Sequence, residues 1–367
     1  MSIIVTAARE YVTRPADERY PSLQAMVDAA GEDKVLNLER AYNLKDLQVV
    51  NGVVNGAETI QLQSPRWEAA FTHWSFGQVC RMLGAPAGYL RQLPPELAAD
   101  CLNLGIAQSA PGTSANVLVR RANRGEPVIR ACTSETYRRL WDVDLYGHID
   151  QSLFHGEGRL SLPLTWDGVP TGAYKGDRDS FLIGVSGGSI VTDPTLSSAQ
   201  AAMMYRGILV RNSEVGACSV VIDCVLYRHI CGNHVLWGAV IDKQFRRRHV
   251  GQHVLRDTVR EIGQVARQWM NRGESADQAI IRGLIDHELA TTREAVVDEL
   301  RAIGATKEQA EAAYDACEQH EQVSPRSYWG VAQGLTRVSQ GEYQDGRYGL
   351  DRLAMAVLQR GAKLVRV

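Results

Sequence analysis

The segment GILVRNSEVGACSVVIDCVLYRH, residues 207–229, carries the strongest β-strand signal of the chain. Two runs rich in β-branched residues, 207–210 and 219–227, flank the short polar stretch 212–216. β-branched runs on either side of a turn-forming polar segment are typical of two paired antiparallel strands. The sequence therefore predicts a long β-hairpin at the centre of the protein, with 212–216 as its turn.

Short strands and helices are predicted on the N-terminal side of the hairpin. Apolar patterns indicate strands at 116–121, 128–132, 160–166 and 180–185. Helical spacing indicates helices at 72–83, 87–93 and 95–104, and a further helix that Ser134 caps and that contains Leu145. The pairs Asn51-Gly52 and Asn55-Gly56 are typical of tight turns, so we expect residues 1–65 to form an arm or a small β unit.

Helical spacing dominates after the hairpin. A short strand is expected at 234–238, and helices then follow at 250–270, 276–285, 288–303, 307–319, 329–337 and 348–360. Strands followed by a run of helices predict an α+β fold, in which a twisted antiparallel sheet with a long central hairpin packs on helices. The expected units are 1–65, an α+β core at 66–272 and a helical C-terminal region at 273–367.

The composition is that of a folded protein. Of 367 residues, 45% are apolar and 22% are charged, which excludes a disordered chain. There is no apolar run of about 18 residues and no secretory signal, and the seven cysteines are scattered. We therefore expect no membrane partner and a cytoplasmic location. The net charge is −2, yet residues 117–260 hold 18 basic against 14 acidic side chains, and residues 286–321 hold three against ten.

Arginines gather around the ends of the predicted hairpin strands and before the helix expected from residue 250. A helix N-terminus attracts phosphate, and interleaved tyrosines can stack on bases. The hypothesis is a basic groove for single-stranded nucleic acid that is formed by Arg206, Arg211, Arg228, Arg246, Arg247, Arg248, Arg120 and Arg121 with Tyr205 and Tyr227. The alternative is that the arginines lie on solvated loops and that the tyrosines belong to the core.

A second candidate site is a set of possible metal ligands near the hairpin exit. Cys231, His234, His249 and His253 follow the spacing C-x2-H-x14-H-x3-H. Thiolate and imidazole ligands in two pairs suit tetrahedral zinc. The alternative is a small buried cysteine and surface histidines beside three arginines, which would repel a dication.

No catalytic residue is predicted. Residues 184–188, GVSGG, resemble the nucleophile elbow of hydrolases, but the residues behind them do not start a helix. No P-loop for ATP binding occurs. Glu214 is a lone carboxylate inside the expected turn. We therefore expect a protein that is not an enzyme, unless the zinc set is catalytic.

The hairpin exit also carries a pattern that resembles a known family. Arg228, Cys231 and Asn233 fit the family's Arg-x-x-Cys-x-Asn pattern, and the Arg248-His249 pair then enters a long helix. This family is carried by phages and plasmids, and its label is a numbered domain of unknown function. The resemblance covers roughly residues 70 to 360. The chain departs from the family at Val250, where a threonine is common.

The resemblance implies a setting of mobile elements in a host-cell cytoplasm, close to genes of replication and recombination. The expected order of strands, hairpin and long helix is similar in outline to phage single-strand annealing proteins, which form rings or filaments around a basic groove. We therefore expect a homo-oligomeric DNA-binding protein that promotes single-strand annealing in bacteriophage homologous recombination. Two alternatives stay open: a zinc-dependent enzyme or zinc-stabilised module, and a phage counter-defence protein that binds a host protein through acidic helices at 286–321.

Overall fold

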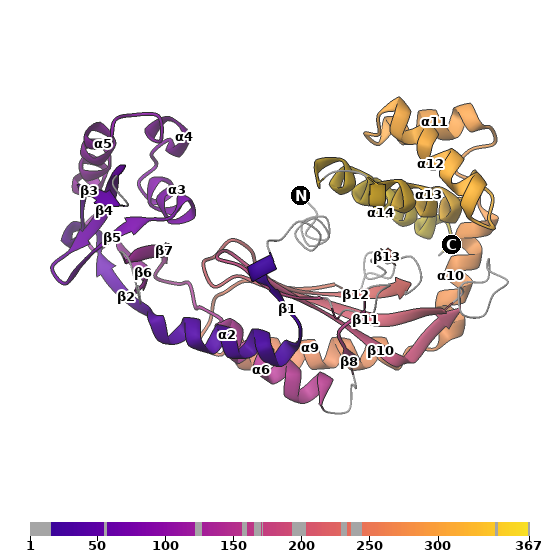
Figure 1. The fold of residues 1–367 in the computed structure, drawn as a ribbon, viewed down its shortest axis with the longest axis horizontal. Coiled ribbons are helices and arrows are strands. Elements are labelled where there is room, and N and C mark those ends of the chain that lie inside the picture. Colours follow the sequence, from indigo (N-terminus) through magenta and orange to yellow (C-terminus); the bar gives the residue numbers. More distant parts are fainter. Residues whose placement is uncertain are drawn as a thin grey trace.

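The computed structural model describes residues 16–365 except 55–56, 122–126, 156–159, 165–169, 171, 193–202, 229–232, 236–243 and 342–343. The chain is curved, with a small sheet and its helices at one end, a large twisted sheet in the middle and a helical region at the other end (Figure 1). An α+β fold with a helical C-terminal region is therefore confirmed. Among the described residues, no helix is both long enough and apolar enough to cross a membrane.

The small sheet has six strands in the order β2-β6-β7-β5-β4-β3. Their bounds are β2 Asn37–Asn43, β3 Gln48–Val54, β4 Ala57–Ser64, β5 Trp67–Phe71, β6 Ser114–Arg120 and β7 Val128–Ser134. Three helices pack against it, α3 His73–Met82, α4 Ala87–Leu90 and α5 Pro95–Gln108. Val79, Leu102 and Ile129 are buried between the helices and the strands, so this sheet has a core of its own.

Two expectations for the N-terminal part are corrected by this sheet. Asn51-Gly52 is not a turn, because the two residues pair with Ile60 and Thr59 inside the β3–β4 ladder. Valines on both sides of the pair continue the strand, and the chain reverses only after Val54. The second expected turn, at 55–56, lies outside the described residues. A boundary at residue 65 would separate β4 from β5, which are hydrogen-bonded neighbours.

The large sheet follows the order β1-β9-β10-β11-β12-β13, with β8 paired to β10 and β14 paired to β12. The bounds are β1 Arg19–Tyr20, β8 Leu160–Ser161, β9 Ala173–Lys175, β10 Ser180–Thr192, β11 Met203–Asn212, β12 Val220–Arg228, β13 Asn233–Val235 and β14 Gln244–Arg247. Strands β11 and β12 are antiparallel from the pair Met204 and Arg228 to the pair Arg211 and Val221. The predicted central hairpin is therefore confirmed.

Three helices lie along one face of the large sheet (Figure 1): α2 Leu23–Leu36, α6 Asp142–Ile149 and α9 Val254–Met270. Their apolar side chains share one core with the sheet, where Leu145 and Ile262 contact the layer that contains Ile222. The helix expected from Ser134 begins only at Asp142, because Ser134 belongs to β7 and Tyr137 bridges to Val250. Short non-α turns occur at η1 Ala16–Glu18, η2 Leu44–Asp46 and η3 Asp150–Phe154.

The C-terminal region contains α10 Glu274–Asp286, α11 Arg293–Ala302, α12 Lys307–His320, α13 Tyr328–Gly341 and α14 Gln344–Val365. All five helices were predicted from their apolar spacing, and the expected boundary at 273 falls one residue before α10. Trp329 of α13 is fully buried among them. Glycines at 330 and 334 face the backbone of Ser324 and Ala313 so closely that no side chain would fit, which lets α12 and α13 approach each other.

Candidate nucleic-acid interface

The hairpin arginines that the sequence assigned to a basic groove are internal. Arg206 is only 2% exposed, and its guanidinium pairs with the buried Asp277 carboxylate. It also donates to the carbonyl of Arg272 at 2.7 Å and lies over the Trp269 ring at 4.9 Å. Arg206 therefore fastens the α9–α10 junction to the large sheet, and its assignment to phosphate binding was wrong.

Arg211 and Tyr205 are also structural. Arg211 is 6% exposed, and its Nη2 lies 2.7 Å from Oδ2 of Asp179 in the turn between β9 and β10. Tyr205 is half-buried and packs against an apolar cluster that includes Leu209 and Val225. Burial against a carboxylate or within a core removes both side chains from contact with a nucleic acid. The side chains of Tyr227 and Arg228 lie outside the described residues, and only their backbone is placed, in β12.

The three consecutive arginines before the long helix do not act together. Arg247 is half-buried and lies 3.0 Å from Glu261 and 3.6 Å from Asp257, both on α9. Arg246 and Arg248 are exposed. Helix α9 begins only at Val254, so the predicted cradle of arginines at its N-terminus does not form. Strand alternation explains why Arg246 and Arg247 differ, because consecutive residues of β14 point to opposite faces and only Arg247 points towards α9.

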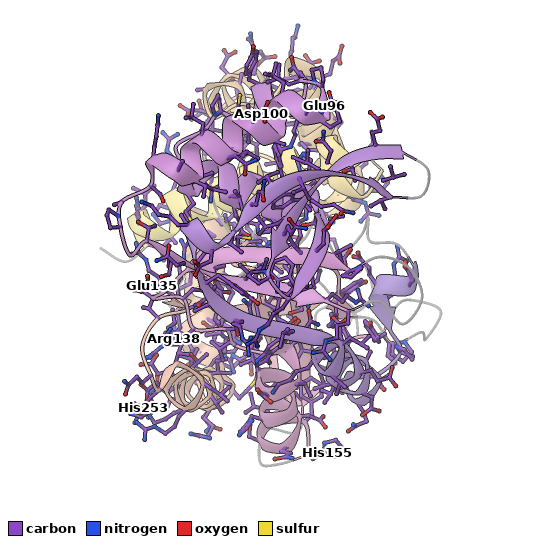
Figure 2. All side chains as sticks on the ribbon, turned by 90° about the vertical axis from the view of Figure 1, so that its left-hand side faces the viewer. Glu96, Asp100, Glu135, Arg138, His155 and His253 are labelled. Carbon is purple, nitrogen blue, oxygen red and sulfur yellow. The ribbon has the colours of Figure 1, made fainter. Side chains whose placement is uncertain are left out.

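Of the four predicted zinc ligands, the structure describes the side chains of His249 and His253 only. His249 is buried and stacks on Tyr137 with ring centroids 5.0 Å apart. Burial, with Arg139 nearby, lowers the pKa of His249 to about 4. His253 lies at the surface just before α9 (Figure 2). Cys231 and the side chain of His234 lie outside the described residues, and no described group of three His, Cys, Asp or Glu residues has the arrangement of a metal site.

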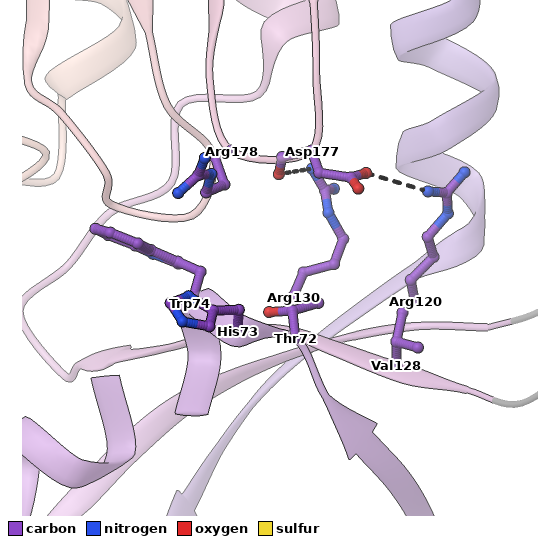
Figure 3. Close-up of a pocket in the computed structure, with 8 residues that line it drawn as sticks. All are labelled: Thr72, His73, Trp74, Arg120, Val128, Arg130, Asp177 and Arg178. Atoms are coloured by element: carbon purple, nitrogen blue, oxygen red, sulfur yellow. Dashed lines mark hydrogen bonds and ion pairs between the residues drawn. The ribbon is translucent and has the colours of Figure 1, made fainter. Parts of the chain in front are cut away.

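A hollow of about 360 Å³ lies where the start of α3 and the ends of β6 and β7 meet the turn between β9 and β10. We call it the arginine pocket. Arg120, Arg130 and Arg178 line it against a single carboxylate, Asp177 (Figure 3). Trp74 and His73 complete one side. The sequence hypothesis included only Arg120 from this set, and the exposed Arg121 adjoins it along the chain.

The start of α3 is shaped by its cap. Thr72 and Ser75 form a capping box, in which the Ser75 amide donates to Thr72 Oγ1 at 3.1 Å and the Thr72 amide donates to Ser75 Oγ at 3.0 Å. A helix has no internal partners for its first amides, so those of His73 and Trp74 are available at the arginine pocket. The positive end of the helix dipole adds to the cationic lining.

Trp74 is held in place by the tip of the central hairpin. Its Nε1 donates to the Val215 carbonyl at 3.0 Å, and Nε2 of Gln78 donates to the same oxygen at 2.7 Å. The Tyr137 hydroxyl donates to the Ser213 carbonyl at 2.8 Å. The predicted turn at 212–216 therefore docks on α3 and β7, joins the two sheets and fixes one side of the arginine pocket.

Arg130 forms the floor of the pocket and belongs to a buried charge network. It is 5% exposed, and its Nη1 lies 3.0 Å from Glu214 and 3.5 Å from Asp33. Its Nη2 donates to the Asp177 carbonyl at 3.3 Å. Asp33 in turn pairs with Lys175 at 2.7 Å. Three segments far apart in the sequence thus hold the guanidinium at one position, as a rigid binding site requires.

Asp142 extends the network below the pocket. Burial raises the pKa of Asp142 to about 7, and the Glu214 carboxylate adds to the effect. Asp142 Oδ1 accepts from Ser180 Oγ at 2.6 Å and from Asn212 Nδ2 at 2.7 Å. Glu214 accepts from the Asp142 amide at 2.9 Å. The lone carboxylate of the hairpin turn is therefore structural.

The two arginines at the mouth of the pocket differ from Arg130 in being accessible. Arg120 has a 40% exposed side chain and lies 3.1 Å from Asp33 and 3.8 Å from Asp177. Arg178 is exposed, and no carboxylate pairs with it among the described residues. Figure 3 shows Arg178 above Trp74 on one side of the pocket and Arg120 on the other. Arg178 is therefore the lining cation whose charge is least offset by carboxylates among the described residues.

Sequence reasoning missed Arg130, Arg178, Trp74 and His73. The available signal for Arg130 was a lone cation in the apolar strand VIRAC, which must find a buried partner. Comparison with protein-family models, curated proteins and solved structures finds no match for this chain. The resemblance to the phage- and plasmid-borne family stays a prediction, and the chemistry of the arginine pocket carries the functional argument.

Proposed function

We propose that this protein binds single-stranded nucleic acid in the arginine pocket, with a backbone phosphate at Arg178 and Arg120 and an unpaired base against Trp74. The observation that supports it most is the convergence of three guanidinium groups and an indole on one hollow. A guanidinium group can donate two parallel hydrogen bonds to two oxygens of one phosphate, and an aromatic ring can stack on any of the bases.

A single strand suits this pocket better than a duplex. The hollow extends between the two sheets down to the buried Arg130. Only an unpaired nucleotide, whose base can turn away from the rest of the strand, can therefore enter the hollow. The indole of Trp74 is half-buried with its Nε1 already bonded to Val215, so its contribution to a ligand is its ring. A flat ring beside a cation is the usual pairing in single-strand binding sites.

The wider proposal adds the expectations drawn from the sequence resemblance. An oligomer of this chain would hold two complementary strands and promote their annealing in phage or plasmid recombination. Charge neutralisation of the two backbones is the mechanism, and no covalent step is needed. Arg246, which is exposed on β14, and Arg248, which is exposed just after it, are further cations for the backbone outside the pocket.

Fluorescence anisotropy with a labelled single-stranded oligonucleotide tests the proposal across a series of salt concentrations. Arg178→Gln should weaken binding about tenfold and reduce the salt slope by about 0.7, the loss of one phosphate contact. Arg267→Gln is the matched control, because Arg267 is an exposed arginine on α9 away from the pocket. Binding that does not depend on salt, or an equal loss of affinity in Arg178→Gln and Arg267→Gln, would refute the assignment of the strand to this pocket.

A further inference from the structure

A second hollow adjoins the arginine pocket on the other side of the α3 cap. It measures about 270 Å³ and lies between β4, β5 and the segment from α4 to α5. The two hollows share Thr72 and His73. The two hollows are therefore neighbours, with the start of α3 between them.

The second hollow differs from the first in its chemistry. Its floor is apolar: Phe76 is 7% exposed and meets the half-buried Phe71 edge to face, with ring centroids 5.9 Å apart. Leu90 and Ala98 close the floor beneath them. Helix α5, which Glu96 and Asp100 mark in Figure 2, supplies the far side. A phosphate would lose its hydration here without gaining enough partners.

A flat cation covers the edge of this hollow. The Arg91 guanidinium lies over the Phe76 ring at 5.1 Å and donates from Nη2 to the His73 carbonyl at 2.9 Å. These two contacts hold the guanidinium plane in one orientation, and because Arg91 is exposed, a ligand can reach its outer side. Glu58 and Thr59 lie at the mouth with polar groups.

We propose that this hollow is a nucleobase subsite, which takes the base next to the phosphate held in the arginine pocket. A nucleobase has flat apolar faces and a polar edge, which fit the apolar lining at Phe71, the outer side of the Arg91 plane and the polar mouth in turn. Guanidinium planes and aromatic rings are the usual stacking partners of unpaired bases. The inference rests on the proposed function, since it places a second part of the same strand.

The experiment compares a single-stranded thymidine oligonucleotide with an oligonucleotide of the same length that carries only abasic sugar-phosphate units. Wild-type protein should bind the thymidine strand on the order of tenfold more tightly. Arg91→Lys keeps the positive charge and removes the planar group, so this ratio should fall to the share that the base against Trp74 contributes, while the salt slope stays unchanged. Arg81→Lys, an exposed arginine of α3 outside both hollows, is the matched control.

The outcomes separate this subsite from the proposed function. If wild-type protein binds neither strand, the proposed function fails. If it binds both strands equally, neither Trp74 nor the second hollow holds a base. If the thymidine strand is preferred but Arg91→Lys leaves the ratio unchanged, the strand is bound as proposed and the base subsite is refuted. Arg178→Gln should weaken both strands equally and keep the ratio, because its contact is to phosphate. Circular dichroism melting of each variant checks that the fold is retained.

Discussion

Two buried titratable groups of the core should oppose each other in the pH dependence of stability. The pKa of Asp142 is raised from 3.8 to about 7, and that of His249 is lowered from 6.5 to about 4. Between these limits the folded protein holds a proton on Asp142 that the unfolded chain releases, so stability falls as the pH rises. The unfolded chain holds a proton on His249 that the folded protein lacks, so stability rises with pH over nearly the same range.

The magnitudes follow from the size of each shift. At 1.36 kcal/mol per unit, the Asp142 shift corresponds to about 4 kcal/mol of unfolding free energy and the His249 shift to about 3 kcal/mol. From about pH 4 to about pH 6.5 the two contributions nearly cancel in the wild-type protein. Replacing either group should therefore make the pH dependence that the other group contributes visible in the unfolding free energy.

Urea unfolding of Asp142→Asn and His249→Phe at several pH values tests this cancellation. As the pH rises from about 4.5 to about 6.5, the unfolding free energy of Asp142→Asn should increase by about 3 kcal/mol relative to wild type. That of His249→Phe should decrease by a similar amount over the same rise. Asparagine keeps the acceptor for Ser180 and Asn212, and phenylalanine keeps the stack on Tyr137. A variant-to-wild-type difference that does not change with pH would refute the linkage.

Three further predictions concern a buried ion pair, a close contact between two helices and the exposure of two cysteines. Arg206→Leu removes a partner of the buried Asp277 carboxylate and should lower the unfolding free energy by about 3–5 kcal/mol in urea titrations, with the salt slope of oligonucleotide binding unchanged. Gly334→Ala places a methyl group against the Ala313 carbonyl and should cost about 1–3 kcal/mol, visible as a lower melting temperature. The exposed Cys101 should react with iodoacetamide in the native protein while Cys132, whose pKa burial raises to about 12, stays unmodified in peptide maps.

Local patterns were sufficient for much of the fold. The hairpin of β11 and β12 follows from two β-branched runs, and α11 and α12 follow from apolar spacing with Thr292 and Thr306 as caps. Helix α2 was missed, because its apolar residues are not gathered on one stripe. Its formation depends on packing against α6 and the large sheet, which no local pattern reports.

The candidate site was less predictable, because it depends on contacts distant in the sequence. In the sequence alone, Arg206 and Arg211 look like free charges. Their partners are distant along the chain: Asp277 lies 71 residues after Arg206, and Asp179 lies 32 residues before Arg211. The arginine pocket joins α3, β6, β7 and the turn after β9, which the docking of the hairpin tip and the charge network around Arg130 bring together. Of its cations, the sequence hypothesis included Arg120 alone.

Photo-crosslinking with a thiothymidine-substituted single-stranded oligonucleotide tests the central claim most directly, because it reports where the strand lies. We expect crosslinked peptides that contain Trp74 or Arg178, and we expect them to be lost in Arg178→Gln. Crosslinks that fall instead on the acidic helices α11 and α12, or that persist unchanged in the variant, would contradict the claim that the arginine pocket holds the strand.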